Sequence, residues 1–382
     1  TNEYSHDGKS SRILYPVVEL TQNNREKLLD KIVSLNVYNG TPSAVAYAEA
    51  AAYLLGINTY AMPNSGYSYS DASTTPKIRN ANNGYVSPLA GIDTSSQCNG
   101  QGIYFLTDGF ANNSYTTTKT LMEKVLDESL SGTGLTGNSP SGNSQTQGWP
   151  EIGKFSKTLR NDKYIKTAVV GFGSLFPNDA NYVRTLTNTK NKQSTYYDCS
   201  KLPDPNVFGL DNQEKANRQD LMNTCNWGAK PQSDIIVDQR SQIPSNVGGY
   251  GNGGFYSAQS PDDVVQSVVK FLDDVKPEFD PVATGSPTLP QDALNPLRIQ
   301  PYGYYASFTP KPQESTQLWV GNMNKYHIHR GELYNSAKTI PLIKSDGSLD
   351  SAANGLWTDG MKGQLPLGLT TNTANEKVAQ RT

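Results

Sequence analysis

Residues 103–109 read IYFLTDG, four apolar residues in a row followed by a polar turn. A strand without alternating polar residues is buried on both faces, as in parallel sheets. Residues 165–172 (IKTAVVGF) repeat this pattern and lead into a glycine, and residues 253–256 predict a third short strand. The sequence therefore predicts buried, parallel strands.

Helical patterns lie between and beside these strands. Helices are predicted near 117–130, 150–159 and 261–275, and two more precede the first strand at 24–35 and 43–55. The first of these two has an apolar stripe and the second is rich in alanine. Strands that alternate with helices of about ten to fifteen residues favour βαβ units. The fold class we expect is α/β with a mostly parallel sheet.

The length of 382 residues exceeds what a single core usually supports, so we expect more than one domain. The first spans 1–278 and carries two polar insertions, at about 58–101 and 174–246. A proline-rich linker is predicted over 279–298. Short strands at 302–308, 318–320 and 326–328 indicate that 299–382 forms a small β-rich module.

Composition excludes some partner classes. Thirty-three basic and 35 acidic residues give a net charge of -2, without a basic block that would follow a phosphate backbone. We therefore expect neither nucleic acid nor an anionic membrane as partner. No apolar run approaches the length of about 18 residues that a transmembrane helix needs. Few charged residues and 22 tyrosines are common in secreted and surface proteins.

The three cysteines have no zinc-ligand spacing. Cys199 and Cys225 lie in the same insertion, which predicts a disulfide formed in an oxidising compartment. Cys98 is then left over, either as a free thiol or with a partner missing from this chain.

Two residues form the candidate metal site. Asp108 follows a buried strand, and ligands of open parallel sheets lie beyond the carboxyl ends of the strands. Thr41 is predicted as the N-cap of the helix at 43–55, with Pro42 as the first helical residue. If both lie on one rim, a carboxylate and a hydroxyl could share a hard cation with water molecules. Mg²⁺ fits such a site, with Mn²⁺ or Ca²⁺ as alternatives. Each residue alone also fits a plain turn or cap.

Residues 40–42 and 105–109 resemble von Willebrand factor A domains. The adhesion site of those domains combines a Thr before a helix, an Asp after a central strand and an Asp-x-Ser-x-Ser motif after the first strand. Residues 7–11 (DGKSS) depart from that motif, with lysine in place of the first serine and no apolar strand before it. We expect the first strand to lie upstream of this chain, so that metal binding here is weak or absent.

A finer resemblance covers nearly the whole chain. Residues 40–42 leading to Glu49, 84–88, Cys98, 149–159, 253–256, 319–326 and 355–360 are similar, in this order, to the PilC/PilY family of type IV pilus tip-associated proteins. The resemblance implies a doubly wound von Willebrand A-like domain followed by the approach to a C-terminal propeller that this chain lacks.

The function implied by this resemblance is adhesion and pilus assembly at the bacterial surface or pilus tip, with a role in twitching motility. Pilins and a host-cell or extracellular-matrix ligand would be the partners. In the mechanism that we expect, an acidic side chain of the ligand or a pilin surface completes the coordination of the cation. The two insertions would then set specificity.

Two other functions remain open, a von Willebrand A ligand-binding module of another surface protein and a hydrolase or lectin-like enzyme. The sequence contains three histidines, none beside a nucleophile elbow, and no phosphate-binding loop with lysine, so we expect no enzyme. His327 and His329 share a strand face but lack a third ligand. Trp227, Trp319 and Trp357 could line a sugar or pilin groove, although buried anchors are the simpler interpretation.

Overall fold

The computed structural model of this protein describes residues 11–35, 41–63, 65–80, 84–92, 100–107, 117–132, 134–137, 148–188, 193–231, 235–236, 249–276, 282–283, 288, 291–292, 295–309, 320–344, 349–350, 352–357, 360–361, 369–371 and 377–379. The chain divides into two compact units, Thr1–Pro277 and Glu278–Thr382. Each unit is described by itself below.

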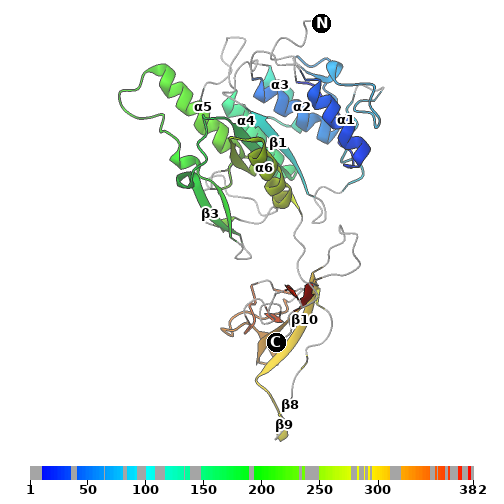
Figure 1. Ribbon diagram of the computed structural model, residues 1–382, viewed down its shortest axis with the longest axis vertical. Coiled ribbons are helices and arrows are strands. Elements are labelled where there is room, and N and C mark those ends of the chain that lie inside the picture. Colours follow the sequence, from blue (N-terminus) through cyan, green and yellow to red (C-terminus); the bar gives the residue numbers. More distant parts are fainter. Residues whose placement is uncertain are drawn as a thin grey trace. The chain divides into compact units, whose positions relative to one another are not determined.

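A parallel sheet lies at the centre of the first unit (Figure 1). Its strands are β1 (Gln101–Thr107), β2 (Ile165–Phe172) and β6 (Asn252–Ala258), in the order β1-β2-β6. Ile103 pairs with Thr167, and Phe172 pairs with Ala258, so the carboxyl ends of the three strands share one edge. The predicted parallel sheet is confirmed, and it has three strands within the described residues.

Helices cover both faces of this sheet. The helices are α2 (Ser43–Leu55), α3 (Thr118–Leu126), α4 (Trp149–Asp162), α5 (Asn212–Gly228) and α6 (Pro261–Val275). Alternate strand residues point to opposite faces. One set, with Ile103, Val169 and Phe255, joins the core formed with α2, α3, α4 and α5. The other set, with Val170 and Tyr256, packs with Phe271 of α6. Burial on both faces explains why the strand sequences do not alternate.

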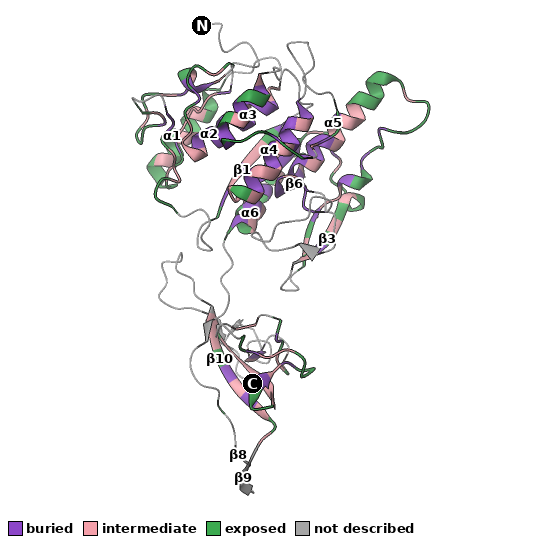
Figure 2. Cartoon of the chain, turned by 180° about the vertical axis from the view of Figure 1, so that it is seen from behind, coloured by how far each residue is buried: buried purple, intermediate pink, exposed green. Residues whose placement is uncertain are grey.

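The larger core centres on aromatic side chains. Tyr47 of α2 contacts Phe155 of α4 and Trp227 of α5 edge-on, with ring centroids 5.2 and 4.9 Å apart. Its hydroxyl lies 2.5 Å from Oγ1 of Thr167, which joins α2 to the sheet. Burial raises the pKa of this phenol. Figure 2 shows α2 and α4 as largely buried.

The predicted start is confirmed for α6 and is wrong for α2. α6 has the predicted bounds, and Ser260 and Asp263 form a capping box at its start. The N-cap position of α2 is Pro42, and Thr41 lies one residue before it, so the prediction of Thr41 as the cap was wrong by one residue. Pro42 has a non-helical ψ of 56° and cannot serve as the first helical residue.

Helix α1 (Gln22–Val33) begins after Thr21, whose Oγ1 accepts a hydrogen bond from the backbone N–H of Asn24. None of its residues is buried. The predicted apolar stripe is therefore largely solvent-exposed, with 52% of Ile32 and 84% of Val33 accessible.

The first insertion is organised around one buried glutamate. Glu49 of α2 is 1% exposed. Its carboxylate accepts hydrogen bonds from the hydroxyl of Tyr85 (2.6 Å) and the backbone N–H of Gly66 (2.9 Å). Tyr67, in the short 3-10 helix η3 (Tyr67–Tyr69), packs edge-on against Tyr85. Described parts of this polar insertion are therefore ordered by a helix of the core.

The second insertion contains a hairpin and a helix. Strands β3 (Val183–Asn188) and β4 (Gln193–Tyr197) are antiparallel, and β5 (Ile235–Ile236) pairs in parallel with β3. Short 3-10 helices η4 (Ala180–Tyr182) and η5 (Cys199–Lys201) flank the hairpin. Helix α5 was not predicted. Its first half is polar and exposed, and only its last turns, with Cys225 and Trp227, enter the core.

A disulfide joins Cys199 of η5 to Cys225 of α5, the pair expected from the sequence, with Cα atoms 5.7 Å apart. Cys98 lies outside the described residues.

The second unit is built on antiparallel strands. β7 (Val282–Ala283), β10 (Tyr302–Thr309), β11 (Val320–His329) and β12 (Glu332–Tyr334) form a sheet in the order β12-β11-β10-β7. β8 (Gln291–Asp292) pairs with β9 (Asn295–Ile299), and β13 (Leu369–Thr371) pairs with β14 (Lys377–Ala379). Val320, the last residue of the strand predicted at 318–320, and the strand predicted at 326–328 belong to the single strand β11, because Val320 to His327 pair continuously with β10.

Two sequence stretches of this unit are joined directly. Oδ1 of Asn324 accepts a hydrogen bond from the backbone N–H of Trp357 (3.2 Å), and Nδ2 of Asn324 donates to the carbonyl of Trp357 (3.1 Å). A Cβ on Gly355 would lie 2.2 Å from Asn324 Oδ1, so only glycine permits this approach.

Candidate functional site

The structure describes only one of the two residues of the predicted metal site. Thr41 is half-buried and lies one residue before the N-cap of α2. Asp108 lies outside the described residues and follows Thr107, the last residue of β1. Across the described ranges, no three His, Cys, Asp or Glu side chains come together as a possible metal site. The joint binding of a cation by Thr41 and Asp108 stays a prediction.

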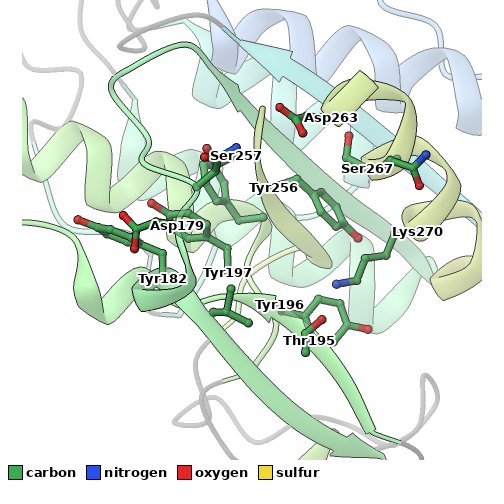
Figure 3. Close-up of a pocket in the computed structure, with 14 residues that line it drawn as sticks. Asp179, Tyr182, Thr195, Tyr196, Tyr197, Tyr256, Ser257, Asp263, Ser267 and Lys270 are labelled. Atoms are coloured by element: carbon green, nitrogen blue, oxygen red, sulfur yellow. The ribbon is translucent and has the colours of Figure 1, made fainter. Parts of the chain in front are cut away.

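A pocket opens where the second insertion meets the sheet and α6 (Figure 3). It has a volume of about 250 Å³. Its lining comes from the segment after β2, the hairpin, the end of β6 and helix α6: Asn178, Asp179, Tyr182, Val183, Thr195, Tyr196, Tyr197, Phe255, Tyr256, Ser257, Asp263, Gln266, Ser267 and Lys270. The segment after β2 contributes, and loops at this edge bind ligands in many parallel α/β proteins.

Aromatic rings form one end of the pocket. Tyr182 of η4 stacks on Tyr197 of β4, with centroids 5.5 Å apart and planes 24° apart. Tyr197 in turn meets Phe255 of β6 edge-on at 5.0 Å. Burial raises the pKa of Tyr197, and its hydroxyl has no hydrogen-bond partner in the described part of the chain. The packing against Phe255 fixes the stack to the sheet.

A lysine defines the other end. Nζ of Lys270 lies 4.2 Å from the ring centroid of Tyr196 and 5.8 Å from that of Tyr256. Figure 3 shows its ammonium group directed between these two tyrosines. Burial lowers the pKa of Lys270. Within the described residues, its ammonium makes contacts with rings and has no ion-pair partner within 4 Å.

A buried ion pair supports this wall of the pocket. Lys230, which follows α5, bonds Oδ2 of Asp274 at 3.1 Å, and its side chain is 4% exposed. The hydroxyl of Tyr196 donates to Oδ1 of Asp274 at 2.7 Å. Burial is the main cause that lowers the pKa of Lys230. The pair holds the insertion against α6 and occupies Asp274, a carboxylate four residues after Lys270.

The remaining polar side chains of the pocket differ in how many hydrogen bonds they make within the protein. Asp263 is engaged in the cap of α6, where one of its oxygens accepts from the N–H groups of Gln259 and Ser260. Asp179 accepts one hydrogen bond through Oδ1, from the backbone N–H of Asn181. Its side chain is exposed, as is that of Gln266. The pocket therefore presents aromatic faces together with carboxylate, amide and ammonium groups.

The pocket residues were not predicted as a site. They come from four separate segments, and none belongs to a recognisable motif. The high tyrosine content was the only sequence signal, and packing and turns explained most tyrosines equally well. Three of the 22 tyrosines, Tyr182, Tyr196 and Tyr197, lie in one short stretch of the sequence.

Other residues singled out from the sequence lie elsewhere. Trp227 is 1% exposed and its ring lies 4.5 Å from that of Phe105, so it is a buried anchor. Trp357 packs on Tyr304 in the second unit, and Trp319 lies outside the described residues. His327 and His329 are on β11, where His329 packs edge-on against Tyr334.

Comparisons with models of protein families, with characterised proteins and with solved structures give no match to this chain. None of the described helices is both long enough and apolar enough to span a bilayer.

Proposed function

We propose that this protein is an adhesin and assembly factor of type IV pili that binds host cells or other surfaces through a von Willebrand A-like first unit. The proposal extends the resemblance to the PilC/PilY family. A sheet of parallel strands covered by helices on both faces agrees with such a unit. A disulfide agrees with an oxidising location, such as the cell surface.

One observation carries the proposal. The stretches on which the family resemblance rests are direct partners in space, although they are far apart in the sequence. Glu49 accepts a hydrogen bond from Tyr85, and the hydroxyl of Ser87 donates to the carbonyl of Leu54. In the second unit, Asn324 holds the backbone of Trp357. Sequence stretches that contact one another in the fold are expected to occur together in a family. The presence of these stretches in the order of the PilC/PilY family therefore supports the resemblance.

The metal site is a separate part of the proposal. Thr41 and Asp108 would bind Mg²⁺, with water completing the coordination. The described residues supply only the hydroxyl of Thr41, and a single hydroxyl does not hold a divalent ion. Titration calorimetry with MgCl₂ tests this part, on this chain, on a chain extended upstream, and on Asp108→Ala in each background. Binding in the extended chain that Asp108→Ala removes is the expected result. Absence of binding in both chains would exclude the metal mechanism.

The function itself is tested by binding of the immobilised chain to purified pilins and to intact pili, beside host cells and matrix proteins. Saturable binding to pilins is the expected result. Binding to cells or matrix without binding to pilins would favour a surface adhesin outside the pilus system. Binding to none of these partners would overturn the proposal. Glu26→Ala, at an exposed site on α1 outside both insertions, is a control that should not change binding.

A further inference from the structure

We propose that the pocket between the hairpin β3–β4, strand β6 and helix α6 binds a saccharide, with a pyranose ring packed on the Tyr182–Tyr197 stack. This inference deepens the proposed adhesive function, on which it rests, by naming the chemical class of the surface ligand.

The first argument is the aromatic platform. Sugar rings have faces of C–H groups, and these pack on tyrosine rings because the rings are apolar and carry a partial negative charge on their faces. Tyr182 is only partly buried and lines the pocket, whereas Tyr197 beneath it is fixed by Phe255. A stacked pair that is already ordered loses little conformational entropy when a ligand binds.

The second argument is the ring of polar groups beside the platform. Asn178, Thr195 and Gln266 line the pocket, are exposed, and make no side-chain hydrogen bond with the described part of the chain. Oδ1 of Asp179 already accepts a backbone N–H, and the carboxylate retains further acceptor capacity. Amide, hydroxyl and carboxylate groups together can donate to and accept from the hydroxyls of a sugar, which need both kinds of partner.

The third argument is the lysine at the far end. Lys270 Nζ lies over the ring of Tyr196, and Asp274 is already engaged by Lys230 and by Tyr196. The N–H groups of Lys270 therefore remain for oxygens of a ligand. Burial lowers the pKa of this lysine, and the charge of Asp274 offsets only part of that effect. A hydroxyl or carboxylate oxygen of a sugar would supply the missing acceptor.

Size also fits this class of ligand. The volume of about 250 Å³ lies below the range of about 300 to 1,000 Å³ for pockets that enclose drug-sized ligands. A small ring, or the terminal ring of a longer chain, suits such a pocket better than a folded partner does.

The experiment is saturation-transfer NMR and titration calorimetry of the full chain with a panel of neutral and acidic pyranoses and short oligosaccharides. We expect binding of at least one sugar. Tyr182→Ala should weaken that binding by about tenfold or more, and so should Lys270→Met. Tyr60→Ala is the matched control, because Tyr60 is half-exposed and lines a separate pocket with Arg79. Circular dichroism and thermal unfolding establish that each variant is folded.

Three outcomes overturn the inference: no sugar binds to the folded chain, binding survives both pocket substitutions, or Tyr60→Ala weakens it equally. The result is separable from the test of the proposed function. If pilins or cells bind and no sugar does, the pocket inference alone fails. If a sugar binds with the expected pattern of variants and pilins do not, the pocket inference stands and the pilus function fails.

Discussion

Replacement of Glu49 by alanine tests whether this one carboxylate organises the first insertion. The side chain accepts hydrogen bonds of 2.6 Å from Tyr85 and 2.9 Å from Gly66, and a longer one of 3.5 Å from Thr59. A hydrogen bond to a charged group contributes about 1.5–3 kcal/mol. The two short bonds together give about 3–6 kcal/mol.

Two effects reduce this figure. Tyr85 keeps a second partner, the hydroxyl of Ser70 at 3.1 Å. Loss of the carboxylate also removes the cost of burying its charge, the same burial that raises the pKa of Glu49. We therefore expect Glu49→Ala to lower the free energy of unfolding of the first unit by about 3 kcal/mol. This corresponds to a decrease in Tm of about 6–12 °C.

The assay is urea unfolding followed by tryptophan fluorescence, since Trp149 and Trp227 are buried in the core of the first unit. Glu49→Gln keeps an acceptor oxygen for Tyr85 and should lose less than half as much. Glu26→Ala, at an exposed site on α1, should change the stability by less than about 0.5 kcal/mol.

The pH dependence of the same variants has a defined sign. A pKa that is raised on folding means that the folded protein binds the proton more tightly. Proton binding by Glu49 therefore adds a stabilisation that is fully present below its unfolded pKa of about 4.3 and is lost as pH rises through its folded pKa. The stability of the original protein should fall relative to that of Glu49→Gln over this range. A loss below 0.5 kcal/mol for Glu49→Ala, with unchanged amide exchange near Gly66, would refute this reasoning.

Two further predictions concern buried charges. Burial raises the pKa of Asp220 to about 6, and Asp220 accepts the indole N–H of Trp149 at 2.8 Å. Proton binding by Asp220 therefore adds a stabilisation that is fully present below pH 4 and is lost as pH rises through 6. The free energy of unfolding of the original protein should fall by up to about 3 kcal/mol relative to that of Asp220→Asn between pH 4 and 7. Parallel pH profiles in thermal unfolding would contradict this. Asp274→Ala should cost about 3–5 kcal/mol in urea unfolding because Lys230 stays buried without its partner. The double variant Lys230→Met/Asp274→Leu should recover much of that loss, and no recovery would show that the tyrosine contacts matter more than the charge.

The sequence predicts the elements whose own composition reflects their burial. β2 and α6 have the predicted bounds because one contains the apolar run from Ala168 to Phe172 and the other has a strong apolar stripe with a capping signal. α5 could not be predicted in this way. Its polar first half faces solvent, and only contacts made by the folded core explain why its last turns are buried.

The candidate pocket could not be predicted from the sequence either, and the reason differs from that for α5. Tyr182, Tyr256 and Lys270 are joined by the packing of an insertion onto the sheet, and no spacing in the sequence encodes that juxtaposition. The prediction for Asp108 rests on the local pattern at the end of β1 alone, and this residue lies outside the described part of the chain.

For the proposed adhesin, the disulfide has a mechanical consequence. The bridge from Cys199 to Cys225 bypasses the segment between them, which has a sequence separation of 26. A pulling force on the hairpin β3–β4 would pass through the sulfur atoms into the core end of α5. Fully extended, the bypassed segment would measure about 90 Å, at about 3.5 Å per residue. While the disulfide is intact, force cannot extend this segment, and a ligand bound to the hairpin stays close to the sheet. Reduction of the disulfide would allow the segment to extend as a long, flexible linker.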